Sequence, residues 1–365
     1  MDRRASLPVS LPVPNPTTSY WHTLSPPPGT LPPDFRSTTG LPRHCSTVII
    51  GSGISGASIA YNLLLNHAAS SPTDPEPRVL LLEARTLCSG ATGRNGGHTK
   101  AASYRSFLGH VSSLGEGEAV KIARLEYDNI KAVHNFAKQH GIECDLVEGD
   151  TVDVVYDEGQ WVEAQEAVGK MRGVFSVDDP VGRYELLTKE ELERDYFVHD
   201  YDYGGKREEI KGGVRPKGSE FEGDVIMGGG LVRGEEEEGL KEFGVSDDSG
   251  FNEGISEYLR ETTPRYFGRD WGDDHQEGRI RREWTGIMGF SPDGFPFVGE
   301  VPGQEGLWVS SSFQGHGMVL CWMCADAVVK MMRGQDHEEE LKGWFPDIFR
   351  ITEERLKKRF RGRLS

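Results

Sequence analysis

Short apolar runs and helical spacings are concentrated toward the two ends of the chain. Thr47–Ile50 is an apolar, β-branched run of the kind that forms a buried strand. Apolar residues from Ala57 to Leu64 then recur on one helical face, and Val79–Leu82 predicts a second buried strand. This order predicts a complete β-α-β unit, in which the two strands run parallel.

Further along the chain the spacing changes several times. Residues 104–140 and 161–172 follow a helical period, whereas residues 146–156 alternate as a strand does. Glutamate, lysine and glycine dominate residues 203–250, where only residues 224–227 predict a strand. The pattern therefore predicts ordered elements on both sides of a polar middle region.

Residues 1–44 have no such pattern. They are rich in proline, serine and threonine, and their proline runs exclude helix and central strand. We expect an extended arm, with Tyr20, Trp21 and Phe35 as the side chains that would pack on the body. Because the arm precedes the first predicted strand, we expect it to be dispensable for cofactor binding.

Charge and composition argue against several classes of partner. The formal net charge is −17, which disfavours nucleic acid and anionic membranes. No apolar run reaches the roughly 18 residues of a membrane span, and residues 1–10 lack the apolar core of a secretory signal. The five cysteines are scattered and do not resemble a disulfide framework, so we expect a reduced, cytoplasmic setting.

A glycine fingerprint joins the first strand to the following helix. Three glycines fit the pattern G-x-G-x-x-G: the first permits a tight turn, the second lets the backbone approach a pyrophosphate, and the third lets helix and strand pack closely. The start of the helix then offers N–H groups and a partial positive charge to phosphates. The pattern predicts a dinucleotide site formed by Gly51, Ser52, Gly53, Ile54, Ser55 and Gly56.

An acidic residue, Glu83, closes the second strand. A carboxylate at this position accepts hydrogen bonds from both ribose hydroxyls of an adenosine and repels a 2′-phosphate, so NADP is disfavoured. Ala84 and Arg85 follow directly and belong to the same predicted site. The alternative interpretation is a chance glycine turn and a glutamate that faces solvent.

A second glycine-rich loop follows this acid. Residues 89–97 contain four glycines, whose exposed N–H groups suit an anion or a flat ring; an NAD-dependent dehydrogenase has no need of such a loop here. At this loop the chain resembles the FAD-dependent amino acid and amine oxidoreductases of the D-amino-acid-oxidase and glycine/sarcosine-oxidase group, over about residues 45–200 and 284–335. The resemblance implies that the loop runs beside the flavin through Gly90, Ala91, Thr92, Gly93, Arg94, Asn95, Gly96 and Gly97.

From residue 284 onward the order is strand, turn, strand, glycine-rich loop and helix, which is similar to the end of that family. The resemblance implies that the helix start, formed by Gly315, His316, Gly317 and Met318, points at the pyrimidine edge of the flavin and stabilises negative charge there. We expect His316 to act through its backbone rather than as an acid or base. Residues 286–291 hold no cysteine where some relatives bond the flavin, so we expect non-covalent FAD.

The resemblance also implies the fold class and its division. We expect an α/β protein with an FAD-binding, Rossmann-like parallel sheet and a smaller antiparallel substrate sheet. Cys321 and Cys324 form a C-x-x-C pattern in the last helix, where cysteines usually pack, and we predict no metal site. The expected parts are a Pro-rich extension (1–44), the front of the FAD domain (45–200), a reduced substrate or linker region (201–283), the end of the FAD domain (284–335) and a charged tail (336–365).

The activity implied by the resemblance is oxidation of a C–N bond in an amino acid or secondary amine, with the flavin reoxidised by oxygen or another acceptor. The partner is then a small-molecule amine or amino acid, and no catalytic residue is assigned. Between Asp202 and Asp224 the chain has only a polar, glycine-rich connection, where the family has further strands and a substrate roof. The alternative is therefore a shortened, catalytically inactive relative that acts as a flavin-binding or interaction protein.

Overall fold

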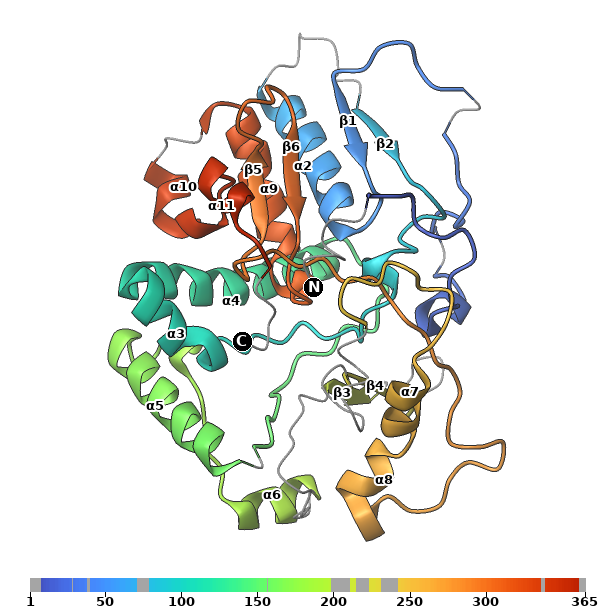
Figure 1. Cartoon of the computed structure of the whole chain (residues 1–365), viewed down its shortest axis with the longest axis vertical. Coiled ribbons are helices and arrows are strands. Elements are labelled where there is room, and N and C mark those ends of the chain that lie inside the picture. Colours follow the sequence, from blue (N-terminus) through green and yellow to red (C-terminus); the bar gives the residue numbers. More distant parts are fainter. Residues whose placement is uncertain are drawn as a thin grey trace.

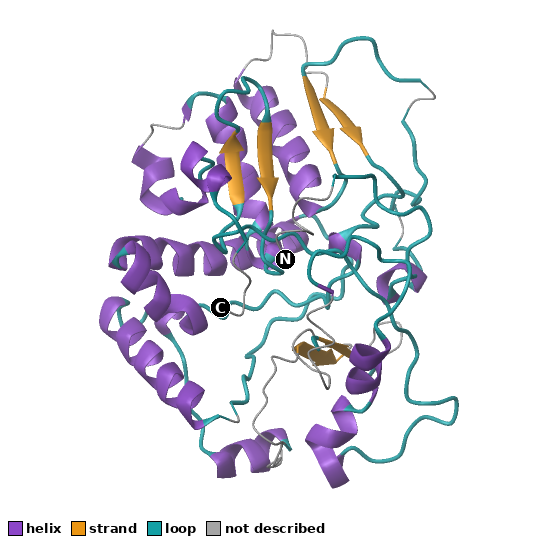
Figure 2. Ribbon diagram, in the orientation of Figure 1, coloured by secondary structure: helices purple, strands orange, loops and turns teal. Residues whose placement is uncertain are grey.

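The computed structural model is an α/β arrangement of helices and short paired strands (Figures 1 and 2). Figure 2 shows most helices along the left side and the bottom of the view, and long loop segments on the right. The fold class is confirmed at the level of a small parallel sheet and small antiparallel sheets. The structure describes residues 8–27, 29–37, 40–70, 79–155, 157–197, 211–214, 223–230, 242–335 and 339–360.

The predicted β-α-β unit is present at the front of the fold. Strand β1 (Thr47–Ile50) leads into helix α2 (Ile54–Ser70), and strand β2 (Val79–Leu82) pairs with β1 in parallel. The expectation of a buried first strand is corrected, because only Ile49 of β1 is buried, against α2, whereas Ile50 is 88% exposed. Within the described residues this sheet has two strands, so the full Rossmann-like sheet stays a prediction.

Residues 297–332 form a hairpin followed by a helix. Strands β5 (Phe297–Glu300) and β6 (Trp308–Ser311) pair in antiparallel fashion. A 3₁₀ turn, η6 (Gly317–Val319), precedes helix α9 (Cys321–Met332), which packs beside α2 (Figure 1). The predicted helix is therefore present, but its α-helical part begins only at Cys321.

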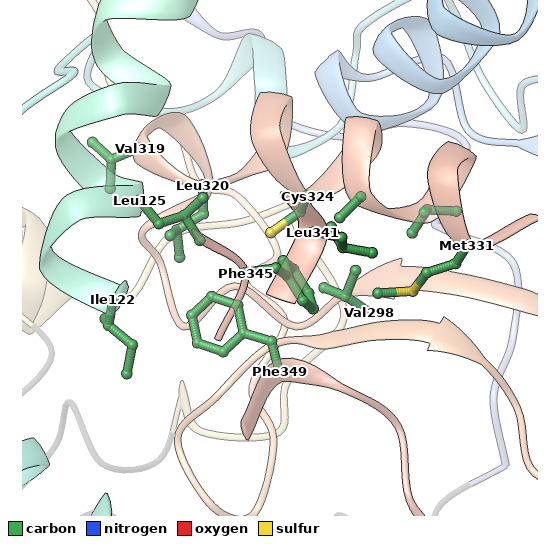
Figure 3. Close-up of a cluster of buried hydrophobic side chains, with 12 residues drawn as sticks. Ile122, Leu125, Val298, Val319, Leu320, Cys324, Met331, Leu341, Phe345 and Phe349 are labelled. Carbon is green, nitrogen blue, oxygen red and sulfur yellow. The ribbon is translucent and has the colours of Figure 1, made fainter. Parts of the chain in front are cut away.

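The main core lies where α9 meets helix α4 (Glu116–Gln139) and the C-terminal region. Figure 3 shows Leu125 of α4, Val298 of β5, and Phe345 and Phe349 in one buried cluster. Burying each phenylalanine stabilises the fold by roughly 1.5–3 kcal/mol. The expectation of a charged tail is thus corrected, since this region contributes core side chains through α10 (Glu339–Trp344), η8 (Asp347–Phe349) and α11 (Glu353–Lys357).

Residues 104–140, which the sequence predicts to be helical, form two helices. Helix α3 (Tyr104–Leu114) ends at Gly115, whose φ of 87° is a left-handed value that favours glycine, and α4 begins at the next residue. Helix α5 (Glu158–Val174) confirms the helix predicted at 161–172 and packs against α3. Residues 146–155 form no strand, contrary to the prediction, because no described strand lies alongside to take their backbone hydrogen bonds.

The middle region is described only in part. Helix α6 (Lys189–Tyr196) precedes an antiparallel pair of strands, β3 (Lys211–Val214) and β4 (Val225–Gly228), and β4 confirms the strand predicted at 224–227. Helices α7 (Glu253–Arg260) and α8 (Thr262–Phe267) follow. The predicted reduction of the substrate roof depends on residues that lie mostly outside the described ones: 198–210, 215–222 and 231–241.

Across the described ranges, no helix combines the length and the apolar composition needed to cross a membrane.

Candidate functional site

The turn between β1 and α2 has the geometry that its glycines predict. Gly51 has a φ of 105°, a value that residues with side chains rarely adopt. A Cβ added to Gly56 would lie 1.9 Å from the Gly51 carbonyl oxygen, so the helix and the strand approach closely only because this residue is glycine. At Gly53 an added Cβ would lie 2.8 Å from Thr92 Oγ1. Each of the three glycines therefore has a structural reason, the first in its backbone conformation and the other two in close contacts, as the dinucleotide fingerprint predicts.

Glu83 is held at the end of β2 by the fingerprint turn. Its Oε2 accepts hydrogen bonds from the Ser52 nitrogen and hydroxyl at 2.9 and 2.6 Å, and its Oε1 accepts one from the Arg85 nitrogen at 3.1 Å. Burial opposes ionisation, but these bonds, together with one from the Ala84 backbone, outweigh it and lower the pKa of Glu83. An ionised carboxylate thus lies where the sequence predicts the ribose contact.

The second glycine loop lies across the start of α2. Its 3₁₀ turn, η2 (Ala91–Gly93), brings Thr92 Oγ1 within 2.9 Å of the Ile54 nitrogen, which donates a hydrogen bond to it. Beside this contact, the Cys88 nitrogen donates to the Ser52 hydroxyl at 3.0 Å. The two front motifs, which are 38 residues apart at Ile54 and Thr92, therefore lie against each other.

Asn95 shapes the remainder of this loop. Its side-chain nitrogen donates to the Thr92 carbonyl at 2.8 Å, and its side-chain oxygen accepts from the Gly97 nitrogen at 2.7 Å. Gly97 has a φ of 78°, and an added Cβ at Gly96 would lie 2.8 Å from the His98 ring. The loop thus has a defined conformation, which runs from Gly90, at the start of η2, to Gly97.

Arg94 points into the protein and holds the loop from within. Its buried guanidinium donates to the Ser89 and Thr285 carbonyls at 2.8 and 2.9 Å and to the Thr17 hydroxyl at 3.1 Å. Its Nε also lies 3.6 Å from a carboxylate oxygen of Asp248. Through these contacts the Arg94 side chain holds the loop in position. The prediction that Arg94 contacts the cofactor therefore concerns its backbone.

Asp248, from the middle region, is a residue that the sequence did not single out. Its buried carboxylate accepts hydrogen bonds from Arg85 Nη1 at 3.0 and 3.1 Å and faces Arg94. Burial lowers the pKa of the nearby His22, and the positive charges of Arg94 and Arg85 lower it further. Asp248 stands in a uniformly polar stretch, so no sequence signal distinguishes it.

The late motif precedes α9, the helix that packs beside α2 of the front motif. Just before η6 the backbone is left-handed at Ser312, Gln314 and Gly315, with φ values of 63°, 56° and 78°. For the two non-glycine residues this conformation is strained by roughly 1–3 kcal/mol each and persists only where the surroundings impose it.

The predicted residues after this turn contact their own turn and α4. His316 Nδ1 lies 3.2 Å from the Gln314 carbonyl oxygen, and the Met318 carbonyl accepts from Asn129 Nδ2 at 3.1 Å. At Gly317 an added Cβ would lie 3.1 Å from the Cys321 sulfur. These contacts are compatible with the expected backbone role of His316, which stays a prediction.

Residues 284–290 contact both the second loop and the late turn. They form no strand, which corrects the expectation of a strand here. Trp284 Nε1 donates to the Arg94 carbonyl at 2.8 Å, and the Gly289 carbonyl accepts from the Gln314 nitrogen at 3.1 Å. An added Cβ at Gly286 would lie 3.1 Å from Arg94 Cβ. The hydrogen bonds of this segment go to loops, which is why extended backbone here belongs to no described sheet.

The two cysteines of α9 are packing residues. Cys324 is fully buried in the core cluster, and burial raises the pKa of the Cys321 thiol to about 11. Both thiols are free. Among the residues that the structure describes, no group of histidine, cysteine or acidic side chains is arranged to hold a metal ion.

Comparison with known proteins agrees with this arrangement of motifs. Residues 46–217 and 213–331 match the model of the FAD dependent oxidoreductase family, so the match extends over more than half of the chain. A stretch of 53 residues, 14% of the chain, is 34% identical to the glycine oxidases of Pseudomonas aeruginosa and Pseudomonas putida. This stretch spans 15% and 14% of those two relatives, so the likeness to them is local.

Proposed function

The chain belongs to the FAD dependent oxidoreductase family, and from this premise we propose that it binds FAD non-covalently and oxidises a C–N bond of an amino acid or secondary amine. The local likeness to glycine oxidases supports this substrate class. The observation that carries the proposal is the hydrogen bond between Ile54 and Thr92, because it joins the dinucleotide fingerprint to the loop predicted to run beside the flavin.

The residues present fit such a dinucleotide. Gly53 and Gly56 have no room for side chains, and the positive φ of Gly51 disfavours one, so no side chain at these three positions keeps a pyrophosphate away. Glu83, ionised and fixed by Ser52, would accept hydrogen bonds from the ribose. The N–H groups at the start of α2 would hold the phosphates, and residues 90–97 and 315–318 would border the ring.

When bound, FAD supplies a two-electron acceptor for this chemistry. The substrate loses a hydride from carbon and a proton from nitrogen, the C–N bond becomes an imine, and water hydrolyses the imine to a carbonyl compound and an amine or ammonia. Oxygen, or another acceptor, takes up the two electrons, and with oxygen the product is hydrogen peroxide. Within this scheme the Arg94 side chain holds the second glycine loop in position, and Asp248 keeps the guanidinium groups of Arg85 and Arg94 in place.

A catalytically inactive relative that still binds flavin is the second candidate. The open face of β1, where Ile50 is 88% exposed, favours it, because parallel strands of α/β enzymes are normally covered on both faces. Since the middle region is also short, we expect turnover to be weak.

The test begins with the visible spectrum of the purified full chain, followed by acid precipitation to release any flavin that is not covalently bound. Amino acids, N-methyl amino acids and cyclic imino acids are then screened for peroxide release and for anaerobic bleaching. A yellow protein that releases FAD and is bleached by an amine supports the proposal. Flavin binding without bleaching favours the inactive relative. Tight binding of NAD with no binding of FAD would overturn both.

A further inference from the structure

Part of the N-terminal arm lies along the second glycine loop. The Ser19 hydroxyl donates to the Gly93 carbonyl, and Trp21 Nε1 donates to the Asn95 carbonyl at 2.7 Å. The Trp21 ring lies so close to Gly97 that an added Cβ there would be 3.0 Å from a ring carbon. The arm, which the sequence predicts to be dispensable, thus contacts both the middle and the end of the loop.

Thr17 ties the same arm to two other segments of the site. Its nitrogen donates to the Asp248 carbonyl at 2.7 Å. Its hydroxyl oxygen accepts from Arg94 Nη1 at 3.1 Å and from the Thr285 nitrogen at 3.0 Å. One residue of the arm therefore joins the second loop, the middle region and the late segment.

Tyr20 anchors the arm in the body of the protein. The residue is 2% exposed, and its ring stacks on Trp284 with ring centres 6.3 Å apart. Its hydroxyl donates to a carboxylate oxygen of Asp224, the residue before β4, at 3.1 Å. Because an aromatic side chain is buried here, the arm is fixed on the loop rather than lying loosely over it.

We propose that residues 17–22 form a strap that is part of the flavin site, with Trp21 as a positioning residue for loop 90–97; this rests on the proposed binding of FAD. The physical reason is entropy. A loop with four glycines loses more conformational freedom on ordering than other loops do, and a tether that orders it beforehand removes that cost from cofactor binding. The same contacts explain why an arm of low sequence regularity carries Tyr20 and Trp21 side by side.

The experiment uses full-length protein and two readouts: the FAD dissociation constant, and amide hydrogen exchange of residues 90–97 in the flavin-free protein. Trp21→Phe removes the indole donor and keeps an aromatic ring, whereas Trp21→Ala removes both. Trp271→Phe is the matched control, because Trp271 Nε1 donates to Asp274 at 3.0 Å on an exposed loop. Thermal unfolding of each flavin-free variant verifies that the fold is kept.

We expect Trp21→Phe to weaken FAD binding roughly threefold to tenfold, as loss of one hydrogen bond does. Trp21→Ala should weaken it by about tenfold or more, because the loop must then be ordered on binding. Both variants should speed exchange in the loop, and Trp271→Phe should change neither readout. Unchanged exchange in Trp21→Ala, or faster exchange with unchanged FAD affinity, would overturn the strap. If the parent chain binds no FAD, the proposed function is overturned, and with it the role of the strap in the flavin site. The exchange data would still show whether the arm orders the loop.

Discussion

The Thr92 hydroxyl accepts a hydrogen bond from the Ile54 nitrogen at 2.9 Å, so a side chain of the second glycine loop caps the first turn of α2. A helix start leaves several N–H groups without partners inside the helix, and a hydroxyl is a usual acceptor for one of them. The same position is where a phosphate oxygen would bind in a dinucleotide site. Loop and cofactor would therefore use the same donor.

Thr92→Val tests this shared donor, because valine keeps the shape and removes the hydroxyl. We expect the flavin-free protein to lose about 1 kcal/mol of unfolding free energy. The FAD-saturated protein should lose less, since a phosphate oxygen then takes the Ile54 N–H. Thr262→Val is the control, because the hydroxyl of Thr262, the first residue of α8, donates to the Tyr258 carbonyl of α7 at 2.8 Å, and this variant should lose equal stability in both states. Denaturant titrations with and without FAD decide, and equal losses for Thr92→Val would contradict the idea.

Gly56→Ala tests the close approach of α2 and β1. Its Cβ would lie 1.9 Å from the Gly51 carbonyl oxygen, a backbone atom that moves only if the strand moves, so we expect a loss of about 3 kcal/mol or more, or no folding. Gly169→Ala in α5 is the counterpart, since its Cβ would meet nothing within 4 Å. That change should stabilise by up to about 1 kcal/mol. A Gly56→Ala protein as stable as the parent in denaturant titrations would mean that strand and helix do not meet in this way.

The front unit was predictable because its signals are local. The turn at Gly51, the packing at Gly56 and the acid at Glu83 all follow from spacing within one β-α-β unit. The contacts of Arg94 and Asp248 were not predictable, because they join segments far apart in the chain and no local pattern encodes a distant partner.

Two other expectations failed for physical reasons. Residues 146–155 alternate as a strand does, but a strand needs a neighbour to take its hydrogen bonds, and none lies alongside in the described part of the chain. The C-terminal region is charged on average, yet Phe345 and Phe349 enter the core, and average composition conceals such single side chains.

Ile49 and Ile50 are adjacent in β1 but face opposite sides of the sheet. Ile49 is 7% exposed and packs toward α2, whereas Ile50 is 88% exposed. Ile49→Ala should therefore cost about 2–4 kcal/mol of unfolding free energy, and Ile50→Ala should change it by less than about 0.5 kcal/mol. Urea titrations of both variants provide the measurement. A large loss in Ile50→Ala would show that something covers this face in solution.

Glu126 makes the stability depend on pH. It is buried in α4, and burial raises its pKa from 4.5 to about 7, although the Ser103 hydroxyl donates a hydrogen bond to it. The folded pKa lies above the unfolded one, so unfolding releases a proton between these values, and stability falls as pH rises from about 4.5 to 7. Glu126→Gln should remove this slope and be more stable than the parent at pH 8 by roughly 1–3 kcal/mol. Exposed Glu163→Gln is the control, and an unchanged slope in Glu126→Gln would refute the assignment.

Glu83→Gln separates a cofactor contact from a structural one. Glutamine keeps the size of the side chain but loses the charge and one acceptor, so FAD binding should weaken by about tenfold or more, as loss of charged hydrogen bonds does. Glu83 also accepts hydrogen bonds from Ser52 and Arg85. Because its pKa is lowered in the folded state, its contribution to the unfolding free energy is complete above pH 4.5 and is lost as the pH falls below that value. Affinity and unfolding are therefore measured on the same samples. Glu300→Gln is the control, because Glu300 likewise ends a strand and accepts from a backbone nitrogen, that of Gly306, at 2.7 Å. If Glu83→Gln lowers stability as Glu300→Gln does while FAD affinity stays unchanged in both, Glu83 only closes the turn and does not bind the ribose.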